Sequence, residues 1–260
     1  MKNVKTACLI AALTGLYGCG GGGGGGGSTS MNLEAAQGIW DSSSYSGTDL
    51  GASTKAIRSV MLKDGNAWVF LLDNLITNNP TPIGLVKASV AVSGQSFSGT
   101  GKRYMLDTHT GSSVEVQGNV PATQQLALKF GAAANPTTLA TLTPLNRAST
   151  AATITGAWTF SSTTATGVGT TTATVTWNID GAGTLSGGDT QGCTFQGQVL
   201  PRSEPAGVFN VTLTQTCAGT VSQYSGVALQ NSASTSITFG LVATDQSTGT
   251  VVVANKVTPT

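Results

Sequence analysis

The side chains best suited to chemistry lie together in the stretch "MLDTHTGSS". Asp107 and His109 fall on the same side of an expected strand, and Ser112 and Ser113 follow closely. A carboxylate, an imidazole and a hydroxyl are the three groups of an acyl-transfer triad. The chain has no G-x-S-x-G turn, however, and serine is abundant throughout, so chance alone explains this proximity. We therefore interpret His109, the only histidine, as a surface residue beside a turn.

Other catalytic chemistry is equally unsupported. Glycoside hydrolysis needs two carboxylates facing each other across a cleft, whereas the eleven acidic residues are scattered mostly beside expected turns, as at Asp49, Asp64 and Asp180. No cofactor-binding motif is present. A zinc site near the later cysteines would need more cysteine or histidine ligands than that region has. We predict that the protein is not an enzyme and has no catalytic, cofactor-binding or metal-binding residues.

Cys19 is the cysteine whose position is most informative. It ends "MKNVKTACLIAALTGLYGC", in which Lys2 and Lys5 precede an apolar stretch from about residue 6 to 16 and a small residue stands before the cysteine. This is the layout of a secretory signal peptide. The apolar stretch has about half the roughly 20 residues that a membrane-spanning helix needs. Residues 1–18 are therefore predicted to be a signal peptide.

The four residues Leu16-Tyr17-Gly18-Cys19 resemble the lipobox of bacterial lipoprotein precursors, although Tyr17 is bulkier than usual. The resemblance implies a diacylglyceryl group on the Cys19 thiol, cleavage before it and acylation of the new amino terminus. The membrane would then be a partner through these acyl chains. Because Gly20 replaces the aspartate associated with inner-membrane retention, the resemblance implies the outer membrane. The alternative is an ordinary cleaved signal.

Eight glycines follow Cys19, and residues 19–30 are interpreted as the lipidated cysteine and a linker. Glycine loses the most backbone entropy on ordering and has no side chain to pack. A random-coil linker of this length has a root-mean-square reach of roughly 18 Å. It would hold a domain clear of the headgroups without fixing its orientation.

The composition favours extended strands outside the cytosol. Only 9% of the residues are charged and 39% are hydrophobic, while 35 are glycine. Without Lys2 and Lys5 the chain carries ten basic and eleven acidic residues. No basic cluster with interleaved aromatic residues is present, so nucleic acid is not an expected partner. No long stretch has the apolar periodicity of a helix, and threonine and valine suit a pleated surface.

An internal repeat divides the rest of the chain. Trp40 and Trp158 each follow a glycine by two positions and lie 118 positions apart. Each is followed by two strand-like runs joined at an Asp-Gly pair, Asp64-Gly65 or Asp180-Gly181, for which we predict two-residue hairpin turns. A period of this length indicates two homologous domains rather than a solenoid.

We predict an all-β fold of two tandem antiparallel domains with about eight strands each. In the second unit the strands are expected near 157–162, 171–179, 182–187, 193–200, 207–216, 221–229, 235–243 and 249–256. Short connections favour a meander that closes into a lipocalin-like barrel, and a sandwich is the alternative. The domains are placed at 31–147 and 152–260, with the boundary around 144–152.

Cys193 and Cys217 lie on neighbouring expected strands, and an exported protein meets an oxidising compartment. We predict a disulfide between them, and the alternative is two buried free thiols. Trp40 and Trp158 are interpreted as plugs at one end of each barrel, and Trp68 as packing between its sheet and a neighbour. The sequence suggests no role for Trp177 or Tyr224.

Taken together, the chain resembles two-domain outer-membrane lipoproteins of Gram-negative bacteria, which are mostly described without a function. The resemblance rests on the lipobox with its polyglycine, "LKDGNAWVFLL", and "GCTFQGQVLPR", "VFNVTLTQTCAG" and "YSGVAL". It implies an envelope lipoprotein but neither a reaction nor a ligand. Three functions remain open: a non-enzymatic binding or structural role, an inhibitor or small-ligand scavenger that uses a barrel mouth or loops, and an enzyme with an unrecognised site.

Overall fold

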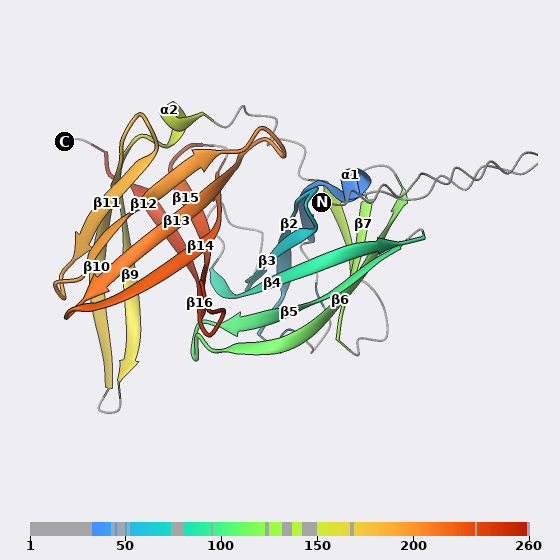
Figure 1. The fold of residues 1–260 in the computed structure, drawn as a ribbon, viewed down its shortest axis with the longest axis horizontal. Helices are drawn as coiled ribbons and strands as arrows, with labels where there is room; N and C mark the ends of the chain where they lie inside the picture. Colours follow the sequence, from blue (N-terminus) through green and yellow to red (C-terminus); the bar gives the residue numbers. More distant parts are fainter. Residues whose placement is uncertain are drawn as a thin grey trace, which may run out of the picture.

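A computed structural model of the chain describes residues 33–42, 45, 50, 53–73, 81–94, 96–122, 125–131, 137–141, 150–166, 169–231 and 233–258. The predicted signal peptide, Cys19 and its linker, and most of the predicted boundary lie outside these residues. The described chain forms two closed antiparallel barrels side by side, as predicted, and not sandwiches (Figure 1). No helix within the described ranges is long and apolar enough to cross a bilayer.

The first barrel is an eight-stranded meander within the described residues. A one-turn helix, α1 (Leu33–Ala36), precedes it. Strands β1 and β8 close the barrel through the pairs Trp40↔Thr141 and Asp41↔Ala140. The strands are β1 (Gly38–Ser42), β2 (Ala56–Met61), β3 (Asn66–Leu72), β4 (Pro82–Ser93), β5 (Ser96–Met105), β6 (Gly111–Ala122), β7 (Gln125–Phe130) and β8 (Thr137–Thr141).

The second barrel repeats this plan. It follows the one-turn helix α2 (Ala151–Ile154) and is closed by pairing of its first and last strands at Lys256↔Trp158 and Asn255↔Thr159. Its strands are β9 (Gly156–Thr166), β10 (Gly169–Ile179), β11 (Thr184–Asp189), β12 (Thr194–Pro201), β13 (Val208–Cys217), β14 (Thr220–Gln230), β15 (Ser236–Ala243) and β16 (Gly249–Lys256). Each expected strand matches one of these, and the largest difference is that β9 continues to Thr166.

Each barrel is closed at one end by its helix and its repeated tryptophan. The indole Nε1 of Trp40 donates a hydrogen bond to Ala36 O, and that of Trp158 donates to Ile154 O, each over 2.8 Å. Both acceptors are the last residues of the one-turn helices. Both rings are buried in the cores of their barrels, which fits the predicted plugs. The helices themselves were not predicted, because one turn is too short to show helical periodicity.

The predicted hairpins form, but the prediction of their turns is wrong. Gly65 N donates to Leu62 O and Leu62 N to Asn66 O, so three residues and not two make the connection. In the second barrel Gly183 N donates to Asp180 O and Asp180 N to Thr184 O in the same pattern. The positive φ angles belong to Gly65 (83°) and Gly183 (84°). The repeat therefore aligns Gly65 with Gly183 and not with Gly181.

The barrels pack against each other through a third apolar cluster. Trp68, Phe70 and Leu85 of the first barrel meet Val227 and Leu229 of the second, and all five are at least 94% buried. The run "NAWVFLL" in β3 is buried on both faces because one face lines its own barrel and the other faces the neighbour. Trp68 thus packs between the sheet and its neighbour, as expected.

The β5–β6 turn of the first barrel also hydrogen-bonds to the β15–β16 turn of the second. Gly249 N donates to His109 O over 2.9 Å, and Gly111 N donates to Ser247 O over 3.0 Å. Between these bonds the Tyr104 hydroxyl donates to Gln246 O over 3.1 Å. The two turns therefore attach the barrels to each other beside the apolar cluster.

Candidate functional site

The strongest candidate site is a cavity of about 390 Å³ inside the second barrel. Its inner wall is apolar and its opening is mainly polar, which is the usual arrangement of a small-molecule site. The apolar lining comprises Phe160, Ala173, Trp177, Phe195, Leu213, Tyr224, Leu241 and Val252. The remaining lining consists of Ser162, Asp189, Gln191, Gln215, Thr250 and the two cysteines, Cys193 and Cys217.

Trp177 lies at the centre of the aromatic wall. Its ring makes edge-on contacts with Phe160, Phe195 and Phe239, at centroid distances of 4.8, 5.8 and 5.1 Å. It pairs directly with Trp158, the residue that closes the far end of the barrel. The Trp177 Nε1 is buried and has no hydrogen-bond partner among the described residues. The cavity therefore ends on a dense aromatic layer.

The inside of the first barrel is filled differently. Ser59 occupies the position of Trp177, since it pairs with Trp40 as Trp177 pairs with Trp158. The connection between β1 and β2 contributes Tyr45 and Leu50 to the core, where Tyr45 contacts Phe130 edge-on at 6.4 Å. Side chains from a loop thus occupy this interior.

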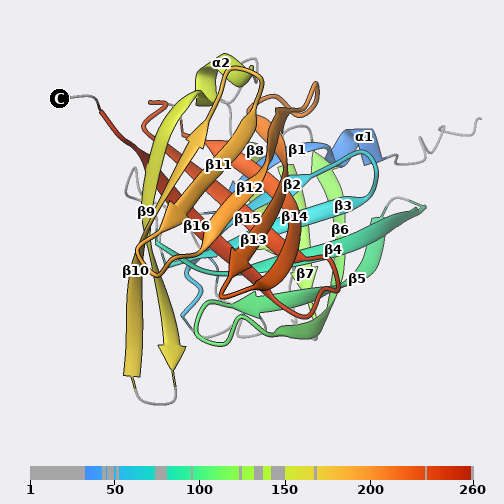
Figure 2. The same ribbon diagram turned by 60° about the vertical axis from the view of Figure 1, so that its left-hand side comes forward.

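In the second barrel, no described residue fills the corresponding space. There β9 and β10 pair continuously from Gly156↔Ile179 to Thr166↔Gly169 and extend beyond the barrel (Figure 2). These two strands therefore continue past the barrel as a hairpin, and the described residues of the hairpin do not fold into the opening. Tyr45 and Leu50 thus fill the first interior, whereas the described residues of the β9–β10 hairpin leave the second interior open.

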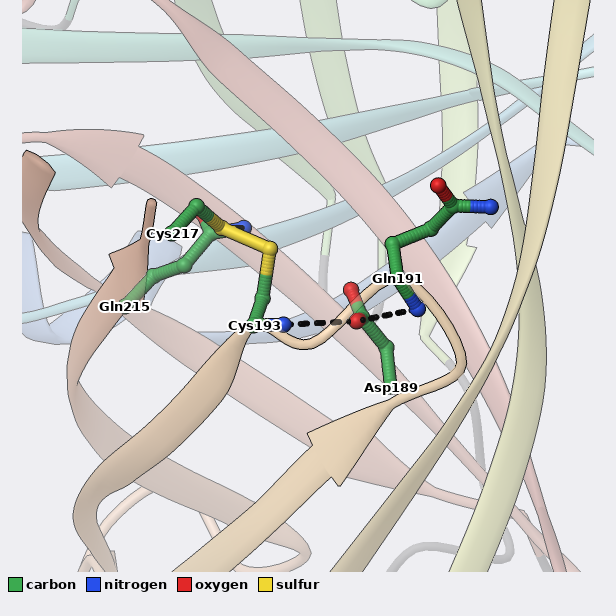
Figure 3. The surroundings of a disulfide bond; sticks show 5 residues. All are labelled: Asp189, Gln191, Cys193, Gln215 and Cys217. Carbon is green, nitrogen blue, oxygen red and sulfur yellow. Dashed lines mark hydrogen bonds between the residues drawn. A yellow bond between two sulfur atoms is a disulfide. The ribbon is translucent and has the colours of Figure 1, made fainter. Parts of the chain in front are cut away.

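The rim of the cavity is held by a tight turn and a disulfide (Figure 3). Asp189 Oδ1 accepts hydrogen bonds from Gln191 N (2.9 Å) and Cys193 N (2.8 Å), which orders the turn between β11 and β12. Cys193 is bonded to Cys217, the last residue of β13, with their Cα atoms 4.3 Å apart. This arrangement fits the predicted disulfide, and it places the pair at the opening.

Charge is unevenly distributed along the second barrel. Among the described residues, Asp189 is the only charged one that lines the cavity. Arg202 follows β12 at the end away from Cys193, and Lys256 ends β16 with its Nζ 5.3 Å from the Trp158 ring centroid. Both basic residues of this barrel therefore lie at its closed end, away from the cavity opening.

The structure does not assemble the triad considered from the sequence. His109 lies in the β5–β6 turn at the barrel interface with a positive φ of 55°. Its described hydrogen bonds use only the backbone, and Ser112 Oγ donates instead to Arg103 O over 3.3 Å. Within the described ranges, no group of three or more His, Cys, Asp or Glu side chains is arranged to hold a metal ion.

A second hollow, of about 430 Å³, lies between the barrels, and the charged residues Asp64, Lys87 and Arg202 line it. Arg202 Nη1 donates to Asn210 Oδ1 over 2.6 Å, and its Nη2 lies 4.0 Å from Asp64 Oδ2. Burial lowers the pKa of Lys87 at this hollow, and the nearby carboxylate of Asp64 opposes the shift. Because Arg202 already has partners in both barrels, we interpret the hollow as part of their interface.

Sequence reasoning identified Cys193 and Cys217 but missed most of the cavity. Trp177 and Tyr224 had no predicted role. Alternation in "TATVTWNI" indicates that Ala173, Val175 and Trp177 share a face. It does not show that the face encloses a space, since that depends on barrel closure and on where the paired strands β9 and β10 extend.

Comparison with known proteins gives no relative from which a function can be taken. No protein-family model, curated protein or solved structure matches the chain.

Proposed function

We propose that this protein is a lipid-anchored lipoprotein of the outer membrane that binds a small apolar ligand in its second barrel without catalysing a reaction. The cavity at the mouth of that barrel carries the proposal. Among the functions left open by the sequence, it favours the small-ligand scavenger over a purely structural role.

The size and lining of the cavity suit this role. Its volume of about 390 Å³ is within the range of small-molecule sites, at the lower end. Leu213, Leu241 and Phe195 are each at least 94% buried and form an inner wall that is already organised. A ligand that covers this wall removes apolar surface from water at about 25 cal/mol per Å².

A fluorescence titration tests the binding site. The chain from residue 31 onward contains every strand pairing, hydrogen bond and core cluster described above, and it can be titrated with the uncharged apolar dye N-phenyl-1-naphthylamine. We expect one dye per protein, with energy transfer from tryptophan. Ala173→Phe fills the opening and should weaken binding about tenfold or more, given the sensitivity of apolar sites to excess volume.

Thr174→Phe is the matched control, because Thr174 lies on the same strand with its side chain exposed. It should leave the dissociation constant unchanged. Absence of saturable binding, or equal binding by the wild type and the Ala173→Phe variant, would refute the ligand-binding role.

The anchor is tested separately. Cells expressing the full chain should incorporate labelled palmitate into it, and the Cys19→Ala variant should not. Several acyl chains, at about 0.8 kcal/mol per buried CH₂, hold a protein at a membrane far better than one chain does. A wild-type chain that stays unlabelled would show that Cys19 is not lipidated.

A further inference from the structure

The rim carboxylate of Asp189 has one oxygen that its own turn does not use. Oδ1 accepts both backbone hydrogen bonds that order the turn, from Gln191 and Cys193. Oδ2 has no bonding partner among the described residues, and Figure 3 shows it turned away from these two bonds. The side chain is half-buried at the edge of the cavity. An acceptor with a full negative charge is therefore available to whatever occupies the opening.

Within the part of the chain that the structure describes, no basic residue lines the cavity to balance this charge. The basic residues of the barrel, Arg202 and Lys256, lie at its other end. Another turn at the same end of the barrel, between β15 and β16, carries Asp245, and its counter-charge is Lys102 of the first barrel. Lys102 donates to Gln246 O over 2.9 Å and does not line the cavity. The opening is thus electrostatically suited to a cation and unsuited to an anion.

Aromatic faces add to this preference. Phe160 and Tyr224 are only half-buried and line the cavity together with Trp177. The face of an aromatic ring is negative and attracts organic cations. A positively charged headgroup at the opening would therefore meet both a carboxylate and aromatic rings.

We propose that the second barrel selects a cationic amphiphile, with an apolar body inside the barrel and an amine headgroup beside Asp189. This inference rests on the proposed ligand-binding function and specifies the chemical class of the ligand. A fatty-acid type of ligand is disfavoured, because its carboxylate would lie next to Asp189 and no described lining residue is basic.

A headgroup series of constant chain length tests the proposal. Decylamine, 1-decanol and decanoate, each below its micelle concentration at pH 7.5, are used to displace the bound dye from the chain that begins at residue 31. Decylammonium should bind most tightly and decanoate most weakly. Exposed and partly buried ion pairs are worth up to about 1 kcal/mol, so we expect the dissociation constant of the amine to be about fivefold lower than that of the alcohol.

Asp189→Asn is the decisive variant. Asparagine keeps a carbonyl Oδ1 that can accept the hydrogen bonds of Gln191 and Cys193, so the turn can form while the charge is removed. The amine should then lose its advantage over the alcohol, and decanoate should bind more tightly than it does to the wild type. Asp180→Asn is the control, since Asp180 also accepts two backbone hydrogen bonds but does not line the cavity.

The outcomes separate the two proposals. If none of the three ligands displaces the dye and the dye itself does not bind, the ligand-binding function fails. If the dye binds but decanoate competes as well as decylamine, or Asp189→Asn changes nothing, only the cationic preference fails. Retention of the dye by the Asp189→Asn variant verifies that its cavity is intact.

Discussion

Tyr104 is buried between the barrels and also forms a hydrogen bond from one barrel to the other. Its ring is 1% exposed, and its hydroxyl donates to Gln246 O of the neighbouring barrel. Burial raises the pKa of Tyr104, and the negative charge of Asp245 adds to the shift. The folded protein therefore favours the neutral phenol more than the unfolded chain does.

Tyr104→Phe should lower the free energy of unfolding by about 1 kcal/mol at neutral pH, through loss of one hydrogen bond. Because the pKa is raised in the folded state, the contribution of the phenol is complete below about pH 10 and is lost as the pH rises through the folded pKa. Urea unfolding from pH 7 to 11.5 should show that the free energy of unfolding of the wild type approaches that of the variant at the alkaline end. If the difference in free energy of unfolding between the two proteins stays constant with pH, the phenol is not buried in solution.

At the scale of single elements, the two equivalent hairpins depend on a glycine in the third position of the turn. Gly183 has a φ of 84°, and a Cβ built there would lie 2.5 Å from Val199 O on the next strand. Val199 N also donates to Gly183 O over 2.8 Å, so the glycine lies directly against β12. The same contact joins Gly65 to Val90 in the first barrel.

Gly183→Ala should therefore cost about 2 kcal/mol, from the left-handed backbone and the close contact together. Two controls separate the cost of the left-handed backbone from the cost of the close contact. Gly192→Ala has a φ of 86° but no atom within 4 Å, so it should cost only the backbone term of about 1 kcal/mol. Gly181→Ala has open space and does not have a positive φ, and it should be nearly neutral. Equal urea midpoints for all three variants would contradict the assignment of the turn.

At the scale of the whole molecule, each barrel has its own hydrophobic core, and a third apolar cluster lies between the two barrels. Val208, Val242 and Val251 are on the outside of the second barrel and are nevertheless at least 95% buried, because the first barrel covers them. In β15 Gly240 has no side chain at the point where the rings of the first barrel approach, and a Cβ there would lie 2.9 Å from Phe70. We infer that each half folds around its own core and that the two halves remain attached through the shared cluster.

A cleavable connection tests this attachment. With a protease site inserted between residues 144 and 149, the two halves should still elute together after cleavage. Val227→Asp should separate them, because an unpaired carboxylate in the shared cluster costs several kcal/mol. Val221→Asp is the control on the same strand, since Val221 is 59% exposed. Cleaved wild-type halves that elute apart would show that the interface does not hold without the covalent link.

The sequence by itself was sufficient for the strands, the repeat and the disulfide pair. Strand alternation is a local property, so "VFNVTLTQ" places Phe209, Val211 and Leu213 on one face, and these residues do line the second barrel. The tandem tryptophans and the cysteine spacing are likewise readable along the chain. The second turn was mispredicted because Gly181 and Gly183 are both available, and the contact of Gly183 with Val199 of β12 selects Gly183.

The cavity and the interface were decided by tertiary structure alone. Val208 shares a face with Asn210, but it is buried while Asn210 is exposed, because only Val208 is covered by the other barrel. The two barrels differ inside. Ser59 stands where the second barrel has Trp177, and Tyr45 and Leu50 fill the first interior, whereas the described part of the β9–β10 hairpin leaves the second open. Burial and enclosed space depend on residues from distant parts of the chain. The local sequence pattern shows which face a side chain is on, but it does not show what covers that face.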